Sequence, residues 1–171
     1  MGIMVKEIQL TQGKVALVDD SDYDYLNQWK WFAYQDHNSW YARRTENNNG
    51  KSITILMHSL LLNTPKGMLP DHKDGNGLNN QRHNLRVCTY SENQHNKRMT
   101  PRNKTSKFKG VHWVNRDKRW RAQIHPPNHL NDIYLGQFVS EIQAAKVYDD
   151  AAKKYFGEFA CTNFKEGGTQ Q

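Results

Sequence analysis

The sequence lacks any long hydrophobic run. No stretch approaches the roughly 18 consecutive apolar residues of a membrane-spanning helix, and the mean hydropathy of the chain is -0.95. The amino terminus also lacks the basic segment followed by an apolar segment that marks a secretory signal. These absences predict a polar, cytoplasmic protein that does not enter a membrane.

Cysteine is scarce, with two residues among 171. Cys88 and Cys161 are far apart and lie in apolar contexts, so we expect buried, reduced thiols and neither a disulfide nor a zinc-binding pair. Hydrophobic residues make up only 36% of the chain. That share supports modest cores, which favours two small domains over one larger domain.

Acidic residues are scarce in one segment. Residues 99–125 hold eight Lys and Arg residues against one acidic residue. In the rest of the chain the basic and acidic residues are equal in number, so this segment accounts for the net charge of +7. Such a segment is the electrostatic footprint of nucleic-acid binding, because each neutralised phosphate releases condensed counterions. A solvated basic linker would have the same composition.

A carboxylate, an imidazole and two amides surround one short loop in residues 69–93. Asp71 and His72 end a short apolar stretch, a loop rich in Gly and Asn follows, and residues 85–89 have the composition of a second strand. A helix that carries Asn93 is predicted next. The order of strand, loop, strand and helix with these polar groups is the outline of a nuclease site.

These residues resemble the HNH nuclease family, in the variant whose third signature position is Asn. The match is His72, Asn84 and Asn93, with Asp71 just before the first position. The resemblance implies a ββα metal finger in which His72 is the general base and Asn84 bridges backbone groups across the loop to hold His72 in line. Asp71 and Asn93 would be the metal ligands.

The ligand types indicate which metal to expect. The Asp71 carboxylate and the Asn93 amide oxygen are hard oxygen donors, which suit Mg²⁺ or Mn²⁺ that keeps several waters and takes phosphate oxygens as further ligands. Zinc would be a poor fit. We therefore expect Mg²⁺, or Mn²⁺, as the cofactor.

The carboxy-terminal part predicts a three-stranded sheet packed on one helix. Strands are expected over residues 108–113, 119–125 and 133–138, and a helix with one apolar face follows Ser140 as its cap. Residues 106–165 closely resemble the plant ethylene-response-factor (APETALA-two) DNA-binding domain. The segments that carry this resemblance include Gly110-Val, Trp120-Arg-Ala, Tyr134-Leu-Gly and Asn163-Phe164.

This second resemblance implies that the sheet, and not the helix, enters the major groove of duplex DNA. Period-two alternation turns Trp120, Ala122 and Ile124 toward the helix and leaves the intervening residues on the outer face. Several positions that the family often fills with Arg hold other residues here. The resemblance therefore implies the way the sheet docks on DNA, but not the base sequence that it recognises. The expected DNA-binding residues of this region are Lys107, Lys109, His112, Trp113, Arg116, Lys118, Arg119, Arg121, Gln123, His125 and Tyr134.

The first 56 residues have the β-branched and aromatic bias of strands, broken by turns at residues 19–22 and 47–50. Residues 57–62 predict a short helix that leads into the finger. Similar regions precede the finger in phage-type HNH proteins that resemble homing endonucleases, so we expect this region to support the finger and to contact the DNA backbone. Arg43 and Arg44 are the candidates for such contacts, and a solvated turn is the alternative.

His58 lies in the short predicted helix. A histidine there could be catalytic, but a packed, hydrogen-bonded helix histidine is the more common arrangement. We therefore expect His58 to be structural.

The sequence thus predicts an α+β protein. Its expected parts are an amino-terminal β-rich region with the finger (1–98, the finger from about 55), a basic linker (99–107), the ethylene-response-factor-like domain (108–165) and a tail (166–171). Each part follows from the composition and motifs described above.

We expect a metal-dependent, homing-type endonuclease of a phage or its bacterial host that cuts double-stranded DNA. One finger supplies one set of catalytic groups, so a monomer would nick one strand, and a double-strand break would need a dimer. No protein partner is implied. Two alternatives stay open: a DNA-binding regulator whose finger is a relic, and an RNA-binding or RNA-cleaving protein.

Overall fold

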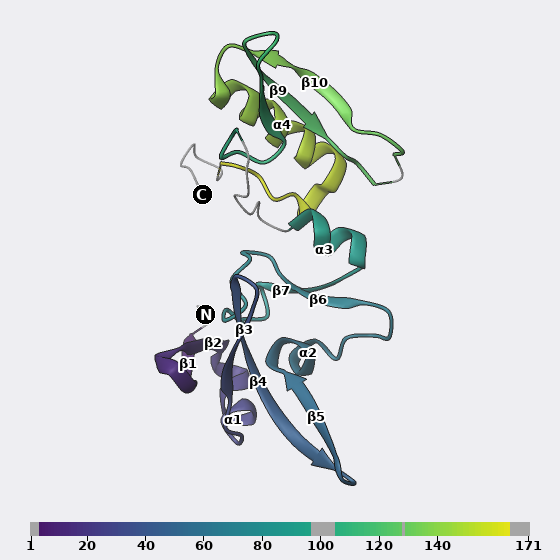
Figure 1. The fold of residues 1–171 in the computed structure, drawn as a ribbon. Helices are drawn as coiled ribbons and strands as arrows, with labels where there is room; N and C mark the ends of the chain where they lie inside the picture. Colours follow the sequence, from purple (N-terminus) through teal and green to yellow (C-terminus); the bar gives the residue numbers. More distant parts are fainter. Residues whose placement is uncertain (1–3, 97–104, 128, 165–171) are drawn as a thin grey trace. The chain divides into compact units, whose positions relative to one another are not determined.

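The computed structural model describes residues 4–96, 105–127 and 129–164, with several small antiparallel sheets and four α-helices among them (Figure 1). They form two compact units, Met1–Tyr90 and Ser91–Gln171. The predicted α+β class is confirmed. The predicted tail and most of the predicted linker lie outside the described residues, so the boundaries at residues 98 and 108 stay predictions. None of the described helices is long and apolar enough to cross a membrane.

Antiparallel strands build most of the first unit. β1 (Val5–Gln9) pairs with β2 (Val15–Asp19), and η1 (Thr11–Gly13) joins them. β3 (Phe32–Asp36), β4 (Ser39–Asn48) and β5 (Lys51–Leu56) form a sheet in that order. The strands predicted from the amino-terminal sequence are therefore present, and they form two separate small sheets.

Two short helices and one more antiparallel strand pair complete the first unit. α2 (Met57–Leu62) lies where a helix was predicted, and it leads to β6 (Leu69–His72), which pairs with β7 (Leu85–Cys88). α1 (Asp20–Leu26) was not predicted, because its acidic start had the composition of a turn. Asp20 and Asp22 lie in its first turn, where carboxylates interact favourably with the helix dipole.

One hydrophobic core joins the elements of the first unit. Trp31 is at its centre with 1% of its surface exposed, and its indole Nε1 donates to the Leu26 carbonyl oxygen at 2.8 Å. The other buried hydrophobic members are Ile8, Leu10, Ala16, Val18, Leu26, Ala33, Ala42, Met57, Leu61 and Leu85. Because β7 contributes Leu85, the hairpin that carries the HNH residues is part of this core.

Both cysteines are reduced thiols, as predicted. Cys88 at the end of β7 is buried, and its thiol donates to the Leu69 carbonyl oxygen at 3.4 Å. Cys161 is only partly buried, which differs from the expected full burial. α3 (Tyr90–Asn96) follows β7 almost directly, so the elements occur along the chain in the predicted order β6, β7, α3.

The second unit holds a three-stranded antiparallel sheet packed on one helix, as predicted. β8 (Val111–Val114), β9 (Arg119–Ile124) and β10 (Ile133–Phe138) pair in the order β10-β9-β8. α4 (Glu141–Phe156) packs against the sheet and η2 (Gly157–Phe159) follows it (Figure 1). A bulge between Tyr134 and Gly136 interrupts the pairing of β10 with β9.

Alternation along β9 explains how the sheet and α4 pack. Ala122 and Ile124 are buried, as predicted, and pack in the same clusters as Ala144 and Tyr148 of α4. The backbone N–H of Gln143 donates to Ser140 Oγ at 3.4 Å, which supports the predicted helix cap. The intervening residues of β9 are thereby turned away from the helix.

Asp149 of α4 holds the segment that follows the helix. Its carboxylate accepts hydrogen bonds from the backbone N–H groups of Asn163 at 2.7 Å and Phe164 at 2.9 Å. The Asn163 amide in turn accepts from the Lys109 N–H at 2.7 Å and donates to the Lys109 carbonyl at 3.2 Å. This network ties Lys109, which precedes β8, and the segment that follows η2 to α4.

Candidate active site

Asp71 and His72 lie at the end of β6, and both are buried, with 7% and 5% of their surfaces exposed. The register of the β6–β7 hairpin sets Asp71 opposite Arg86. Arg86 Nε donates to Asp71 Oδ2 at 2.9 Å, and Arg86 Nη2 lies 2.8 Å from the same oxygen. The expected metal ligand is therefore also the partner of a buried arginine, which the sequence had not indicated.

The His72 ring is oriented by Asn80, another residue that the sequence analysis missed. His72 Nε2 lies 3.4 Å from Asn80 Oδ1, and Asn80 is fully buried. Asn80 Nδ2 donates to the Leu78 carbonyl oxygen at 3.2 Å, so its Oδ1 is turned to the histidine. The only available signal was the pair Asn79-Asn80 within the loop, which did not distinguish one amide from the other.

Burial governs the protonation of His72. Loss of hydration lowers the pKa of His72, and the hydrogen bond with Asn80 and the charges of Asp74 and Asp71 oppose this only in part. The imidazole is therefore neutral near pH 7, which is the state that a general base requires.

His58 and Tyr41 pack against His72. The His58 ring lies 4.9 Å from the His72 ring at 86°, and Tyr41 lies 5.6 Å from His58 and 6.0 Å from His72. Burial, with a smaller contribution from His72, lowers the pKa of His58 to about 3. His58 is packed, as expected, but its Nδ1 has no hydrogen-bond partner among the described residues.

Asn84 joins the two sides of the loop between β6 and β7. Its Oδ1 accepts from the Asp74 backbone N–H at 3.1 Å, and its Nδ2 donates to the Asn79 carbonyl oxygen at 2.8 Å and to Asp74 Oδ1 at 3.0 Å. The Lys73 N–H also donates to the Asn84 carbonyl at 2.9 Å. These bonds fix the backbone that directly follows His72.

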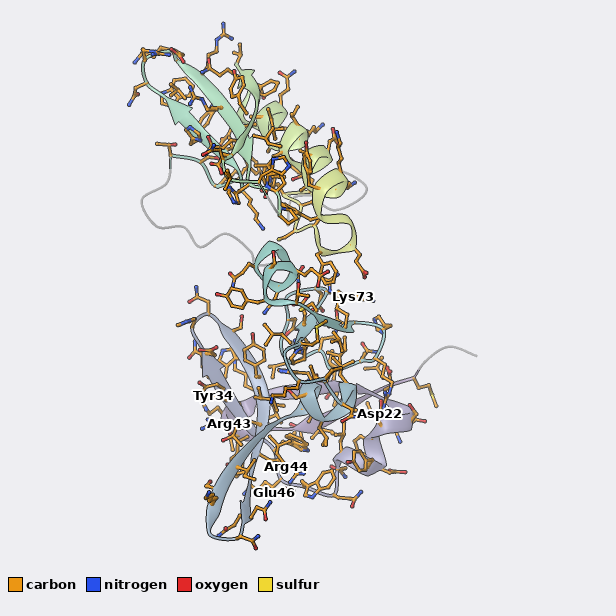
Figure 2. All side chains as sticks on the ribbon, turned by 90° about the vertical axis from the view of Figure 1, so that its right-hand side faces the viewer. Asp22, Tyr34, Arg43, Arg44, Glu46 and Lys73 are labelled. Atoms are coloured by element: carbon orange, nitrogen blue, oxygen red, sulfur yellow. The ribbon has the colours of Figure 1, made fainter. Side chains whose placement is uncertain are left out.

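The amino-terminal hairpin and α1 hold the other end of this loop. Arg82 makes a two-nitrogen contact with Asp22, at 2.7 Å for both Nε and Nη2, and its backbone N–H donates to Asp19 at 2.9 Å. Leu17 of β2 exchanges backbone hydrogen bonds with Leu78 and Asn80 at 2.8 and 2.7 Å. Figure 2 labels Asp22 on α1 and Lys73, the first residue of the loop after β6.

The structure brings Asp71, His72 and Asn84 together on one hairpin and its loop. Asn93 lies on α3, whose residues from Ser91 onward belong to the second unit. Within the described ranges, no three His, Cys, Asp or Glu side chains gather as a metal-binding group. The ligand pair expected here is a different donor set, one carboxylate and one amide oxygen, and its hard oxygens suit Mg²⁺.

The two arginines predicted to contact the DNA backbone differ in placement. Arg44 is buried: its guanidinium lies 4.1 Å over the Trp29 ring and pairs with Glu46. Arg43, one residue earlier, lies 4.2 Å over the Tyr34 ring (Figure 2). Because the Arg44 guanidinium is buried, the DNA-binding surface proposed below includes Arg43 but not Arg44.

The outer face of the second unit's sheet carries part of the predicted DNA-binding set, including His112, Arg121 and Tyr134. Arg121 lies on the central strand opposite His112, and its guanidinium is 5.7 Å from the ring of Tyr134, which is 60% exposed. Burial and the Arg121 charge lower the pKa of His112. The predicted residues that are exposed are Lys107, Arg116, Lys118, Arg119, His125 and Tyr134, and those partly buried are Lys109, His112, Trp113, Arg121 and Gln123.

Two acidic residues on this surface are paired. Asp132 accepts from Gln123 Nε2 at 2.7 Å and lies 3.0 Å from His125 Nδ1. Asp117 accepts from Arg116 Nε at 2.7 Å and from Gln137 Nε2 at 2.7 Å. Three of the expected DNA contacts, Arg116, Gln123 and His125, are thus engaged with carboxylates in the free protein.

Trp113 and Trp120 form a cross-strand pair. The register of β8 and β9 sets them opposite each other, with ring centroids 5.0 Å apart at 64°. Trp113 Nε1 also donates to Asn115 at 3.1 Å. Trp120 packs toward α4, so its partner Trp113 lies on that face of the sheet and not on the outer face with Arg121. The pair stabilises the pairing of β8 with β9, and both rings are partly exposed.

Sequence comparison relates this chain to two groups of proteins. A family described as HNH endonuclease matches residues 63–95. An uncharacterized HNH endonuclease of Acanthamoeba polyphaga mimivirus is 35% identical over 99 residues, 58% of this chain and 49% of the relative. Protein 3.8 of Escherichia phage T7 is 42% identical over 60 residues, 35% of this chain and 49% of the relative.

The second group consists of plant transcription factors. An AP2-like ethylene-responsive transcription factor of Arabidopsis thaliana is 42% identical over 58 residues, which are 34% of this chain and 12% of the factor. This chain therefore spans less than half the length of each of these three relatives. Both resemblances expected from the sequence are confirmed: the chain contains an HNH endonuclease domain at residues 63–95 and is homologous to the AP2-like DNA-binding domain of plant ethylene-responsive factors.

Proposed function

We propose that this protein is a metal-dependent endonuclease that nicks duplex DNA, and that its second unit directs it to the target. The observation that carries this proposal is the arrangement at the end of β6, where the buried, neutral His72 follows Asp71 and faces Asn80. An HNH endonuclease domain over the same residues supports a phosphodiester substrate.

His72 is the proposed general base. Because its Nε2 faces an amide oxygen, we assign the proton of the neutral ring to Nε2 and the lone pair to Nδ1. Nδ1 would then take the proton of a water aimed at the scissile phosphorus. A positioned base of this kind contributes about 10² to 10⁴ in rate.

Asp71 and Asn93 are the proposed metal ligands, and Mg²⁺ or Mn²⁺ is the proposed metal. When bound, the ion would stabilise the charge that grows on the phosphate and on the leaving 3′ oxygen. Arg86 fixes the orientation of the Asp71 carboxylate through two contacts with one oxygen. The same guanidinium adds a positive charge beside a site that must accept an anionic substrate.

Asn84 has a positioning role in this proposal. It spans the loop between Asp74 and Asn79 and thereby fixes the backbone next to His72. Substitution of Asn84 would make the position of the His72 imidazole less well defined, but it would not remove any group that touches the substrate.

The sheet of the second unit is the proposed DNA-binding surface, with Arg43 as an additional contact in the first unit. Arg119, Arg121 and Tyr134 lie on the outer face of this sheet, on the side away from α4. A sheet of this kind can contact base edges in the major groove. One finger per chain supports a nick by a monomer. The homing-type role is proposed from the resemblance of the amino-terminal region to those of phage-type HNH proteins, and one relative of this chain is a phage protein.

The test is nicking of a supercoiled plasmid by the purified chain with Mg²⁺, Mn²⁺ or EDTA, resolved on a gel. The expected product is an open circle that appears only with metal and is lost in His72→Ala. His72→Ala should still bind duplex DNA, and Asn48→Ala, an exposed substitution on β4, serves as the matched control.

Each other product would change the proposal. Linear plasmid as the first product would replace the monomeric nick by paired active sites. Undiminished cleavage by His72→Ala would remove the base assignment. If DNA that the protein binds tightly is not cut with any metal, the chain is a DNA-binding regulator, and a preference for RNA in competition would replace the DNA substrate.

A further inference from the structure

The hairpin of β4 and β5 extends beyond the core of the first unit as an exposed arm. All ten residues from Thr45 to Thr54 are exposed, and the two strands remain paired to their ends, where Asn48 lies opposite Lys51. Asn49 and Gly50 close the hairpin with positive φ values of 51° and 78°, as a tight two-residue turn requires. A two-stranded ribbon gains little stability from its own packing, so this length of exposed arm points to a partner.

The register separates the arm into two faces with different chemistry. Thr45 lies opposite Thr54 and Asn47 opposite Ser52, and alternation places them on the same face as Arg43. We call these five residues the reading face: Arg43, Thr45, Asn47, Ser52 and Thr54. The opposite face carries Arg44, Glu46, Asn48, Lys51 and Ile53.

The two faces differ in whether they carry a carboxylate. Glu46 is the arm's acidic residue, and it lies on the opposite face, where it pairs with the buried Arg44 (Figure 2). The reading face therefore presents hydroxyl and amide groups with one cation, Arg43, and no carboxylate. Such a surface can approach a polyanion and can also exchange hydrogen bonds with base edges.

The reading face continues directly to the proposed base. Tyr41 precedes Arg43 by two residues on the same strand face, and its ring is 6.0 Å from His72. A strand rises about 3.4 Å per residue, so Asn47 lies about 20 Å along the strand from Tyr41. That length corresponds to roughly six base pairs at about 3.4 Å each.

We propose that the reading face enters the major groove of duplex DNA beside the scissile phosphate and contacts the bases there. A two-stranded ribbon fits the major groove, and an Asn side chain can pair with the edge of adenine through both its donor and its acceptor. This inference rests on the proposed function and adds to it a second recognition element, located in the nuclease unit itself and separate from the carboxy-terminal sheet.

A matched pair of single substitutions in the full chain tests the proposal. Asn47→Asp keeps the side-chain oxygen that accepts from the Gly50 N–H at 3.1 Å, but replaces the amide donor by a negative charge on the reading face. Asn48→Asp makes the same change of charge one residue later, on the opposite face. Affinity for a pool of random-sequence duplex oligonucleotides is measured in EDTA, and nick positions are sequenced with Mg²⁺.

Asn47→Asp is expected to weaken duplex binding about tenfold or more, which is the loss expected for one good base contact. It should also reduce the base preference within about six base pairs of the nick. Asn48→Asp should leave affinity and nick positions unchanged. The uncharged double variant Thr45→Ala/Thr54→Ala should lose base preference at the same positions.

Equal effects of Asn47→Asp and Asn48→Asp, or no effect of either on affinity, would overturn the proposal. If the wild-type chain binds the duplex pool but never nicks it, the proposed nuclease activity fails. The affinities of Asn47→Asp and Asn48→Asp for the pool would then still show whether the reading face contacts DNA. If the wild-type chain binds no duplex DNA, both proposals fail.

Discussion

Arg86 contacts one oxygen of Asp71 with two of its nitrogens, Nε at 2.9 Å and Nη2 at 2.8 Å. Both side chains are 8% exposed, and the pairing of β6 with β7 sets them opposite each other. The ion pair therefore lies inside the proposed catalytic hairpin. Its partners are held by backbone hydrogen bonds between strands, so the carboxylate has a fixed orientation before any metal binds.

Removal of Arg86 should destabilise the first unit. Arg86→Ala would remove the guanidinium that contacts the buried Asp71 carboxylate, and breaking a buried pair in this way costs about 3 to 5 kcal/mol. Urea unfolding of the wild type, both single variants and Asp71→Ala/Arg86→Ala would measure this. The double variant should lose less stability than the two single losses added together, and simple additivity would contradict the coupling.

Asn80 should control the rate of cleavage through His72. Asn80→Ala removes the acceptor that faces His72 Nε2, and loss of such an orienting partner costs about 10- to 100-fold. Single-turnover nicking should fall by this factor while duplex binding stays the same. Asn80→Asp retains an acceptor oxygen and should recover part of the rate. An unchanged rate in Asn80→Ala, with the fold verified by circular dichroism, would show that His72 needs no such partner.

His58 should make the first unit sensitive to acid. Its pKa falls from an ordinary 6.5 to about 3 in the folded protein, so the unfolded chain binds this proton at higher pH. The stabilising contribution of neutral, buried His58 is complete above pH 6.5 and is lost as the pH falls toward 3, at about 1.4 kcal/mol per pH unit. In His58→Leu, the free energy of unfolding should fall less steeply between pH 6.5 and 4.5. Parallel profiles for both proteins would contradict the burial of a neutral imidazole.

Gly110 should be essential to the second unit. A Cβ at this position would lie 1.9 Å from Tyr148 Cδ2, and the φ of +74° is itself unfavourable for an L side chain. Gly110→Ala should therefore cost more than about 3 kcal/mol by overpacking. Gly157→Ala is the control, because Gly157 also has a positive φ, +53°, but a Cβ there meets nothing within 4 Å. That control reports backbone strain without a clash, about 1 to 3 kcal/mol, because Gly157 at ψ -128° has a conformation that L residues rarely adopt.

Arg121 should contribute a phosphate or base contact from the centre of the sheet. Arg121→Gln is expected to weaken duplex binding, and if the contact is with phosphate, to reduce the salt dependence of binding by about one counterion. Lys146→Gln removes the same charge from the exposed side of α4 and should have little effect. Equal losses from both substitutions would indicate nonspecific electrostatics.

Local patterns predicted much of this fold. The strands of both units and α2 follow from β-branched, aromatic and apolar periodicity, and the alternation along β9 correctly turned Ala122 and Ile124 inward. The HNH signature likewise located Asp71, His72 and Asn84 on one hairpin and its loop. These features depend on residues that are close in sequence, so the sequence reveals them directly.

Contacts between distant segments could not be predicted in this way. α1 begins with the composition of a turn, and Arg82, which pairs with its Asp22, is 60 residues away. Arg44 appeared exposed by its charge, yet Trp29 and Trp31 cover its guanidinium. Asn80 and Arg86 acquire their significance only when the chain closes on His72 and Asp71, because one loop amide or one strand arginine resembles another in sequence.

The contacts of Asp19 and Asp22 with Arg82 have a consequence for the autonomy of the HNH region. They join the end of β2 and α1 to the loop that follows His72. A recombination event that transferred only residues 63–95 to another gene would leave these carboxylates behind and release that loop. A segment that is to keep the loop in this form when it moves between genes therefore has to include Asp19 and Asp22.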